Sequence, residues 1–213
     1  MAGNFSYAAG ALLLLLAAGC AAADTPVTTV EPSVAGEAEK NYPQLEAQRA
    51  QALRGDANAQ FILAGRYERG QGAPQSYAEA AKWYRQAAEQ GHAAAQFYLG
   101  AMYGSARGVE PDYAAAVMWY RKAAAQGYRD AFYPLAYVHE FGIGGAAQDY
   151  TAAVQWYLKS AEAGVWQAMD RLGKAYQNGE LGLTPDTDKA KDWSAQATAT
   201  RGSQQKLTVP VSR

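Results

Sequence analysis

One twelve-residue segment occurs four times in this chain, and this repetition limits the possible folds more than any other feature. The segment reads AVMWYRKAAAQG at 116–127, and its copies are AAKWYRQAAEQG (80–91), AVQWYLKSAEAG (153–164) and the more divergent AKDWSAQATATR (190–201). Their tryptophans, Trp83, Trp119, Trp156 and Trp193, are 36, 37 and 37 residues apart. Within 213 residues, four such units predict a stack of repeats that share one continuous core.

Each repeat divides into two predicted helices. In the first helix a small residue, a leucine and an aromatic or histidine recur four apart, which places them on one face. These triplets are Ala59/Leu63/Tyr67, Ala95/Leu99/Tyr103, Ala131/Leu135/His139 and Ala168/Leu172/Tyr176. A glycine-bearing loop follows, and the second helix opens at a residue type that caps free amide groups, namely Ser76, Asp112, Asp149 and Asp186. The four repeats therefore span 55–90, 91–126, 127–163 and 164–200.

Small residues flank each tryptophan of the second helix and let helices approach closely while the indole fills the space between them. These are Ala80, Ala116, Ala153 and Ala190 three residues before it, and Ala87, Ala123, Ser160 and Ala197 four residues after it. A glycine then ends the helix in the first three repeats, at Gly91, Gly127 and Gly164, because glycine adopts a left-handed conformation without strain. One such helix pair cannot bury its apolar face alone, so the segment must repeat.

The pattern A-x-x-x-L-G/A-x-x-Y, a glycine loop, D-Y-x-x-A and W-Y-x-x-A-A-x-x-G resembles the Sel-one-like repeat family, a relative of the tetratricopeptide repeat, over residues 55–200. The third repeat departs from it with His139 and with Pro134, and Pro134 requires that its helix start or kink nearby. The fourth ends in Arg201 instead of glycine. The resemblance implies an all-α fold, a right-handed superhelical solenoid of antiparallel helix pairs. It also implies a non-enzymatic adaptor or scaffold for protein partners, often in exported or membrane-associated complexes.

The N-terminal segment 1–19 has the features of a signal peptide. Its apolar run from Tyr7 to Gly19 is shorter than the ~20 residues that span a bilayer. Small residues precede Cys20 as in bacterial lipoprotein signals, in which this cysteine is lipidated, although the first ten residues lack Lys and Arg. Since Ala21 resembles the outer-membrane sorting class, we expect an outer-membrane lipoprotein that faces the periplasm. An ordinary cleaved signal peptide and an uncleaved anchor are the alternatives.

The segments outside the repeats receive simpler interpretations. Residues 20–41 comprise the lipidated cysteine and a flexible tether with two prolines. Residues 42–54 form a capping helix, in which Leu45, Ala52 and Leu53 share one face. Residues 201–213 are expected to be a mobile tail.

Composition and spacing argue against several kinds of chemistry. A net charge of −1, from 19 basic and 20 acidic residues, disfavours a nucleic-acid partner. A single cysteine allows no intrachain disulfide, and His92 and His139 lack ligands at metal-binding spacing. We therefore expect no catalytic site, no metal and no cofactor. Some exported relatives with a cysteine pair in each repeat are linked to cell-wall-type ligands, so a cell-wall-ligand binder or hydrolase is the alternative, although those cysteines are absent here.

A partner site is predicted from positions two residues before each repeated leucine, since in related repeats the first helix lines the concave face. Three of these positions are aromatic, namely Phe61, Phe97 and Tyr133. They could form a groove for an extended peptide, or they could pack between neighbouring repeats. Further candidates for the rim of this groove, with solvated surface as the alternative, are Arg69, Tyr137, Glu140 and Lys174.

Overall fold

The computed structural model describes residues 43–208 of the chain. The predicted signal peptide, Cys20 and the tether lie outside the described residues, as does the end of the predicted tail. Statements about these segments therefore stay predictions.

The described part of the chain is all-helical. The helices are α2 (Pro43–Leu53), α3 (Ala57–Arg69), α4 (Tyr77–Glu89), α5 (Ala93–Ser105), α6 (Tyr113–Ala125), the 3-10 turn η2 (Arg129–Ala131), α7 (Phe132–Phe141), α8 (Tyr150–Glu162), α9 (Trp166–Asn178) and α10 (Thr187–Thr208). From α3 onward they follow the predicted alternation of first and second helices, which confirms the all-α repeat class. None of the helices between residues 43 and 208 is long and apolar enough to cross a membrane.

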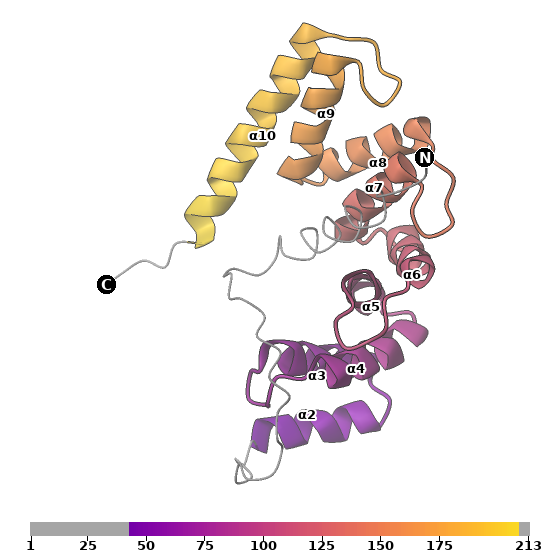
Figure 1. Cartoon of the computed structure of the whole chain (residues 1–213). Helices are drawn as coiled ribbons and strands as arrows, with labels where there is room; N and C mark the ends of the chain where they lie inside the picture. The colour runs from indigo at the N-terminus through magenta and orange to yellow at the C-terminus, as the bar shows by residue number, and fades with distance from the viewer. Residues whose placement is uncertain (1–42, 209–213) are drawn as a thin grey trace. The chain divides into compact units, whose positions relative to one another are not determined.

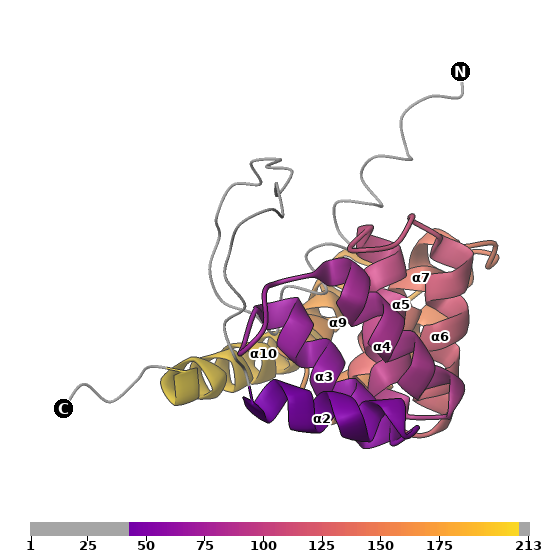
Figure 2. The ribbon, with the colours of Figure 1, turned by 90° about the horizontal axis from the view of Figure 1, so that it is seen from below.

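The chain divides into two compact units, Met1–Pro111 and Asp112–Arg213. The boundary falls inside the second repeat, after its first helix. In unit 1, α2 packs on α3, α3 on α4 and α4 on α5 (Figure 2). In unit 2, contacts likewise join consecutive helices from α6 to α10, and α9 and α10 lie side by side (Figure 1).

The helix ends follow the sequence signals. The predicted side-chain caps accept backbone N–H groups three residues ahead, with distances of 3.2, 2.9, 2.9 and 3.0 Å for Ser76, Asp112, Asp149 and Asp186. Gly91, Gly127 and Gly164 have φ angles of 91°, 78° and 87°. Capping therefore fixes where the second helix of each repeat starts, and glycine fixes where it stops in the first three repeats, as predicted.

The core is built from the repeated leucines and alanines. Leu63, Leu99, Leu135 and Leu172 are at most 1% exposed. Trp83 and Trp119 are also buried, whereas Trp156 and Trp193 are only partly buried. The predicted close packing around the indole is thus complete in the first two repeats and looser in the last two.

A histidine caps the first helix of the second repeat. His92 Nδ1 accepts the N–H of Ala95 at 3.2 Å, so the ring proton resides on Nε2, which lies 3.1 Å from Asn58 Oδ1. Burial lowers the pKa of His92 below its ordinary value of 6.5. Protonation of Nδ1 would also remove this cap. At the equivalent position in the first repeat, Asp56 makes the same bond at 3.0 Å.

Pro134 lies in the first turn of α7, so the expectation of a helix starting near it is confirmed. Its missing N–H falls among the N-terminal amides that have no partner within a helix. The preceding residues form the turn η2 instead of a further helical turn, and α7 has only 10 residues.

Two predictions about the ends of the repeat array are wrong. Residues 201–208 continue α10 and are not a mobile tail, because Arg201 stands where a helix-ending glycine occurs in the other repeats. Arg201 also lies over the Trp166 ring, 4.9 Å from its centroid, and Gln204 donates to the carbonyl of Gly164 at 3.2 Å. At the other end, Leu45 and Ala52 are buried, but Leu53 is 70% exposed and does not share their face.

Glycines in two of the connecting loops, Gly108 and Gly144, allow the loop to touch the preceding repeat within its unit. Gly108 has a φ angle of 69°, and a Cβ added there would lie closer than 3.0 Å to the backbone carbonyl of Tyr77 at the start of α4. Gly144 approaches Tyr113 at the start of α6 in the same way. Gly72 shares this register and φ angle, but a Cβ there would meet only the end of the Arg66 side chain.

Candidate partner-binding site

The predicted aromatics of unit 1 take part in a cluster between helices. The Phe61 ring is stacked on His92 with centroids 4.7 Å apart, and it is tilted against Tyr84 and Tyr98 at 5.7 and 5.8 Å. Phe97 is half-buried and meets Tyr98 edge-on at 5.3 Å. These contacts favour the packing interpretation for Phe61. The groove interpretation of Phe97 stays a prediction.

The third predicted aromatic, Tyr133, belongs to unit 2. It is half-buried and packs edge-on against Tyr157, with centroids 5.5 Å apart. Burial, with a smaller contribution from the charge of Glu140, raises the pKa of Tyr133 to about 12. Its hydroxyl group is therefore neutral at physiological pH.

Glu140 and Tyr137 are buried, contrary to the prediction that they lie on an exposed rim. Glu140 is 5% exposed and accepts hydrogen bonds from the Tyr157 hydroxyl at 2.6 Å and from Arg171 Nη2 at 2.6 Å. Tyr137 is 6% exposed and packs on the Phe141 ring, with centroids 4.4 Å apart. A helical pattern alone did not identify Glu140 as buried, because its partner Arg171 belongs to the next repeat.

The Glu140 network fixes the packing of the third repeat on the fourth. Arg171 Nη1 also lies 2.6 Å from a carboxylate oxygen of Glu180, so one guanidinium group binds both Glu140 and Glu180. Burial alone lowers the pKa of Arg171, but the hydrogen bonds and charge of Glu140 outweigh it and the net shift is upward. Burial and then Glu140 raise the pKa of Tyr157 well above its ordinary value. The buried charge is thus paired and fully hydrogen-bonded, as such groups must be.

The first repeat contains the same tyrosine–glutamate pair with a different neighbour. Tyr84 donates to Glu68 at 2.7 Å, at the registers of Tyr157 and Glu140. The residue at the register of Arg171 is Tyr98, which stacks on Tyr84 with centroids 5.2 Å apart. The first and third repeats therefore share this pair, while the group beside it changes from an aromatic ring to a guanidinium.

Arg69 and Lys174 are exposed, which agrees with the solvated-surface alternative. Arg69 Nε donates to Gln71 at 3.1 Å, and Lys174 pairs with Asp170 at 2.7 Å. Exposed pairs of this kind contribute little to stability. Binding of a partner by the predicted residues stays a prediction.

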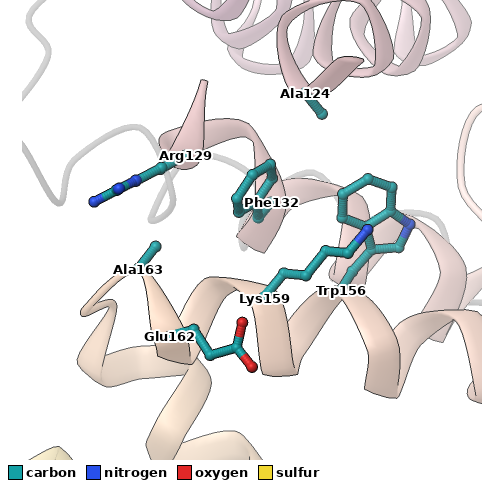
Figure 3. A pocket seen from close by; sticks show the side chains of 7 residues that line it. All are labelled: Ala124, Arg129, Phe132, Trp156, Lys159, Glu162 and Ala163. Carbon is teal, nitrogen blue, oxygen red and sulfur yellow. The ribbon is translucent and has the colours of Figure 1, made fainter. Parts of the chain in front are cut away.

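A pocket of about 330 Å³ opens in unit 2 at the N-terminal end of α7 (Figure 3). Its lining residues are Ala124 of α6, Arg129 of η2, Phe132 of α7, and Trp156, Lys159 and Glu162 of α8, with Ala163 at the end of α8. In Figure 3 the Arg129 guanidinium lies on the side of Ala163, and the Lys159 ammonium lies on the side of Trp156.

The pocket combines aromatic and charged groups. The rings of Phe132 and Trp156 lie 5.7 Å apart at 38° to each other, and Lys159 Nζ is 4.5 Å from the Trp156 ring centroid. Among the described residues neither Arg129 nor Glu162 forms an ion pair. Sequence reasoning missed this site because it compared only the positions two before each leucine. The replacement of a repeated glutamine by Phe132, one position earlier, could have revealed it.

The family model of the Sel1 repeat matches residues 57–92, 93–128, 133–165 and 166–199. The chain belongs to the Sel1 repeat family. The third match begins at Tyr133, beyond the turn η2 that precedes α7. Repeats of this family form a helical fold that typically mediates protein–protein interaction.

Two solved structures are similar to this Sel1 repeat chain. One is a protective antigen present in uropathogenic Escherichia coli strains that displays an SLR fold, with 36% identity over 73% of this chain and a TM-score of 0.67. The other is a Sel1 repeat protein from Oxalobacter formigenes, with 34% identity over 74% of this chain and a TM-score of 0.69. The aligned part covers 33% of the first structure and 62% of the second. No curated protein matches the chain.

These structures support the predicted solenoid of antiparallel helix pairs. Residues 43–208 contain no group of three or more His, Cys, Asp or Glu side chains placed to hold a metal ion. The pocket of unit 2 places aromatic rings beside charged groups, and such groups suit non-covalent recognition.

Proposed function

We propose that this Sel1 repeat chain is a non-enzymatic scaffold or adaptor of the bacterial cell envelope that presents a helical surface to a protein partner. The observation that carries the proposal is the contrast between a constant framework and varied neighbouring positions. The four repeated leucines and the four helix caps keep their roles. The residue before the leucine, in contrast, changes from Ile62 to Tyr98, Pro134 and Arg171. Stacked helix pairs on such a framework create the extended surfaces that repeat proteins use for binding.

Rigid packing supports the same function. Phe61, Tyr84 and Tyr98 join three helices of unit 1 through aromatic contacts, and Glu140 with Arg171 joins α7 to α9 in unit 2. A surface that is already ordered loses little conformational entropy when a partner binds. A partner can therefore bind specifically through few contacts with these helices.

The envelope location rests on the N-terminal sequence. We propose lipidation of Cys20 and an outer-membrane anchor facing the periplasm, because a short apolar run and small residues precede this cysteine. Several acyl chains on one residue would give stable anchoring that one chain alone does not. Cys20→Ala should release the protein from membrane pellets and abolish labelling with radioactive palmitate. Continued pelleting of the variant would contradict the lipoprotein assignment, and an ordinary signal peptide would leave the wild type soluble.

The scaffold is tested by crosslinking in the native envelope, followed by affinity capture and mass spectrometry. Phe97→Ala should lose the partner while the helical circular dichroism signal and the melting temperature stay unchanged. Met118→Ala is the matched control, since it also shortens a partly exposed apolar side chain, and it should retain the partner. A large drop in the melting temperature of Phe97→Ala would assign this ring to packing.

Failure to capture any protein would count against the scaffold and favour the cell-wall alternative. That alternative predicts that the purified chain pellets with peptidoglycan or releases soluble fragments from it. Absence of both results would exclude it.

A further inference from the structure

We propose that the pocket lined by Phe132 and Trp156 is a docking site for a segment of a protein partner that presents an aromatic side chain beside a carboxylate. This inference rests on the proposed scaffold function and assigns the partner's recognition chemistry to unit 2. It depends on a comparison of the same registers in successive repeats.

In the first repeat a glutamine pair fills the place that the pocket occupies in the third. Gln60 Nε2 donates to the carbonyl of Ala52 at 3.0 Å, and Gln60 Oε1 accepts from Gln90 Nε2 at 2.7 Å. In the second repeat, Gln96 makes the equivalent bond to the carbonyl of Ala88 at 3.1 Å, and Gln126 follows at the register of Gln90. These side chains close the gap between the end of one helix pair and the start of the next.

The third repeat replaces the pair with residues that cannot make this bridge. Phe132 stands at the register of Gln60, Ala163 at that of Gln90, and Ala124 at that of Ala88. All three line the pocket. Ala163 is too short to fill the space. The tryptophan that is buried in the first two repeats is only partly buried here as Trp156. The pocket thus lies at a junction where the third repeat departs from the first two.

The lining indicates an aromatic anchor. Phe132 and Trp156 present two ring systems 5.7 Å apart, and a third ring could pack against them in offset or edge-on geometry. A volume of about 330 Å³ is at the lower end of the range for ligand pockets, so it suits one large side chain better than an extended ligand. Aromatic side chains are also the commonest anchors of protein interfaces.

The charges indicate a carboxylate beside that ring. Arg129 replaces Ala57 and Ala93, the residues at its register in the first two repeats. Together with Lys159 it gives the pocket two cations against the one carboxylate of Glu162. Arg129 has no anionic partner among the described residues. An Asp or Glu side chain of the partner segment could therefore form an ion pair with its guanidinium group. A guanidinium group binds carboxylates with particular directional specificity.

The test uses two peptides that differ only in charge. The full chain, labelled with ¹⁵N, is titrated with acetyl-Trp-Asp-amide and with the isosteric acetyl-Trp-Asn-amide, and amide chemical shifts are followed. We expect the acidic peptide to shift the amides of Ala124 and Ala163 and to bind about twofold to fivefold more tightly, as for a partly exposed ion pair. Arg129→Ala, which copies Ala57 and Ala93, should remove that preference. Equal affinity of the two peptides for the wild type would overturn the assignment of a carboxylate.

A second variant closes the pocket with residues that the repeat already tolerates. Phe132→Gln combined with Ala163→Gln recreates the Gln60–Gln90 pair, so the variant should fold and should lose peptide binding at least tenfold. Unchanged binding would overturn the site. In the capture experiment this double variant should lose the partner, and retention of the partner despite lost peptide binding would place docking elsewhere. The peptide titration does not require the natural partner. If the peptides bind but no partner is captured, the result therefore contradicts the proposed scaffold function and leaves the pocket assignment intact.

Discussion

Two glycine-to-alanine substitutions at equivalent positions of neighbouring repeats should differ sharply in their effect on stability. Gly72 and Gly108 each lie nine residues after the repeated leucine, and both have a φ angle of 69°. An alanine at either position adopts the same disfavoured left-handed conformation. Only Gly108 also lies against backbone, at Tyr77 where α4 begins.

The magnitudes follow from these two contributions. The left-handed conformation costs a residue with a Cβ about 1–2 kcal/mol, partly offset by the reduced freedom of alanine in the unfolded chain. We therefore expect Gly72→Ala to lower the free energy of unfolding by about 1 kcal/mol, because the neighbouring Arg66 side chain can move aside. At Gly108 the added Cβ would lie closer than 3.0 Å to the Tyr77 carbonyl, so the loop must shift from α4. Overpacking of this kind adds about 2 kcal/mol, for a total of about 3 kcal/mol.

The assay is equilibrium unfolding in urea, followed by far-UV circular dichroism, with hydrogen exchange to locate the change. Gly108→Ala should accelerate exchange in the first turn of α4 and in the loop after α5. Gly72→Ala should leave exchange in α5 unchanged. Equal losses of stability in the two variants would refute the reasoning, since they would mean that the approach to Tyr77 contributes nothing beyond backbone conformation.

Three further predictions concern buried or capping side chains. Ser160 is fully buried, and its hydroxyl has no hydrogen-bond partner among residues 43–208. Ser160→Ala, which restores the alanine of the other repeats, should therefore stabilise the chain by about 1 kcal/mol in a thermal or urea melt. Glu140→Ala should lower the free energy of unfolding by about 3 kcal/mol, because it removes the hydrogen-bond acceptor of Tyr157 and the buried ion-pair partner of Arg171. Tyr157→Phe should lower it by about 1.5 kcal/mol. Because the pKa of His92 is lower in the folded chain than its ordinary value of 6.5, the neutral ring stabilises the fold. This stabilisation is complete above pH 6.5 and is lost as the pH falls toward the folded-state pKa. His92→Asp keeps a helix cap and should not lose this stability in urea melts between about pH 7.5 and 5. Parallel pH dependence of stability in the wild type and in His92→Asp would contradict the prediction.

The sequence predicted most of the framework because the determinants are local. Helix starts depend on side chains such as Asp112 and Asp149 that bond their own backbone three residues ahead, and helix ends depend on glycines that are visible in the sequence. Pro134 could likewise be placed at a helix start from its own geometry. Such features need no knowledge of the tertiary structure.

The features that sequence reasoning missed depend on neighbours that are distant in the sequence. From the sequence, Glu140 resembles a solvated helix residue, because its partner Arg171 lies 31 positions later in the chain. The continuation of α10 past Arg201 depends on the ring of Trp166 in the adjacent helix. Propensity and periodicity carry no information about these pairings, so burial of a charge or extension of a helix is visible only in the folded chain.

A repeat architecture explains why the third repeat could change at one junction without loss of the fold. In a stack whose stability is a sum of repeats and nearest-neighbour contacts, replacement of a glutamine pair affects one junction and no distant part of its core. The Gln60–Gln90 pair contributes hydrogen bonds that compete with water, so its net contribution is modest. Phe132 offsets the loss by packing on Trp156. A binding pocket can therefore arise at low cost in stability at any junction where the bridging glutamines are absent and a bulky ring supports the helix start.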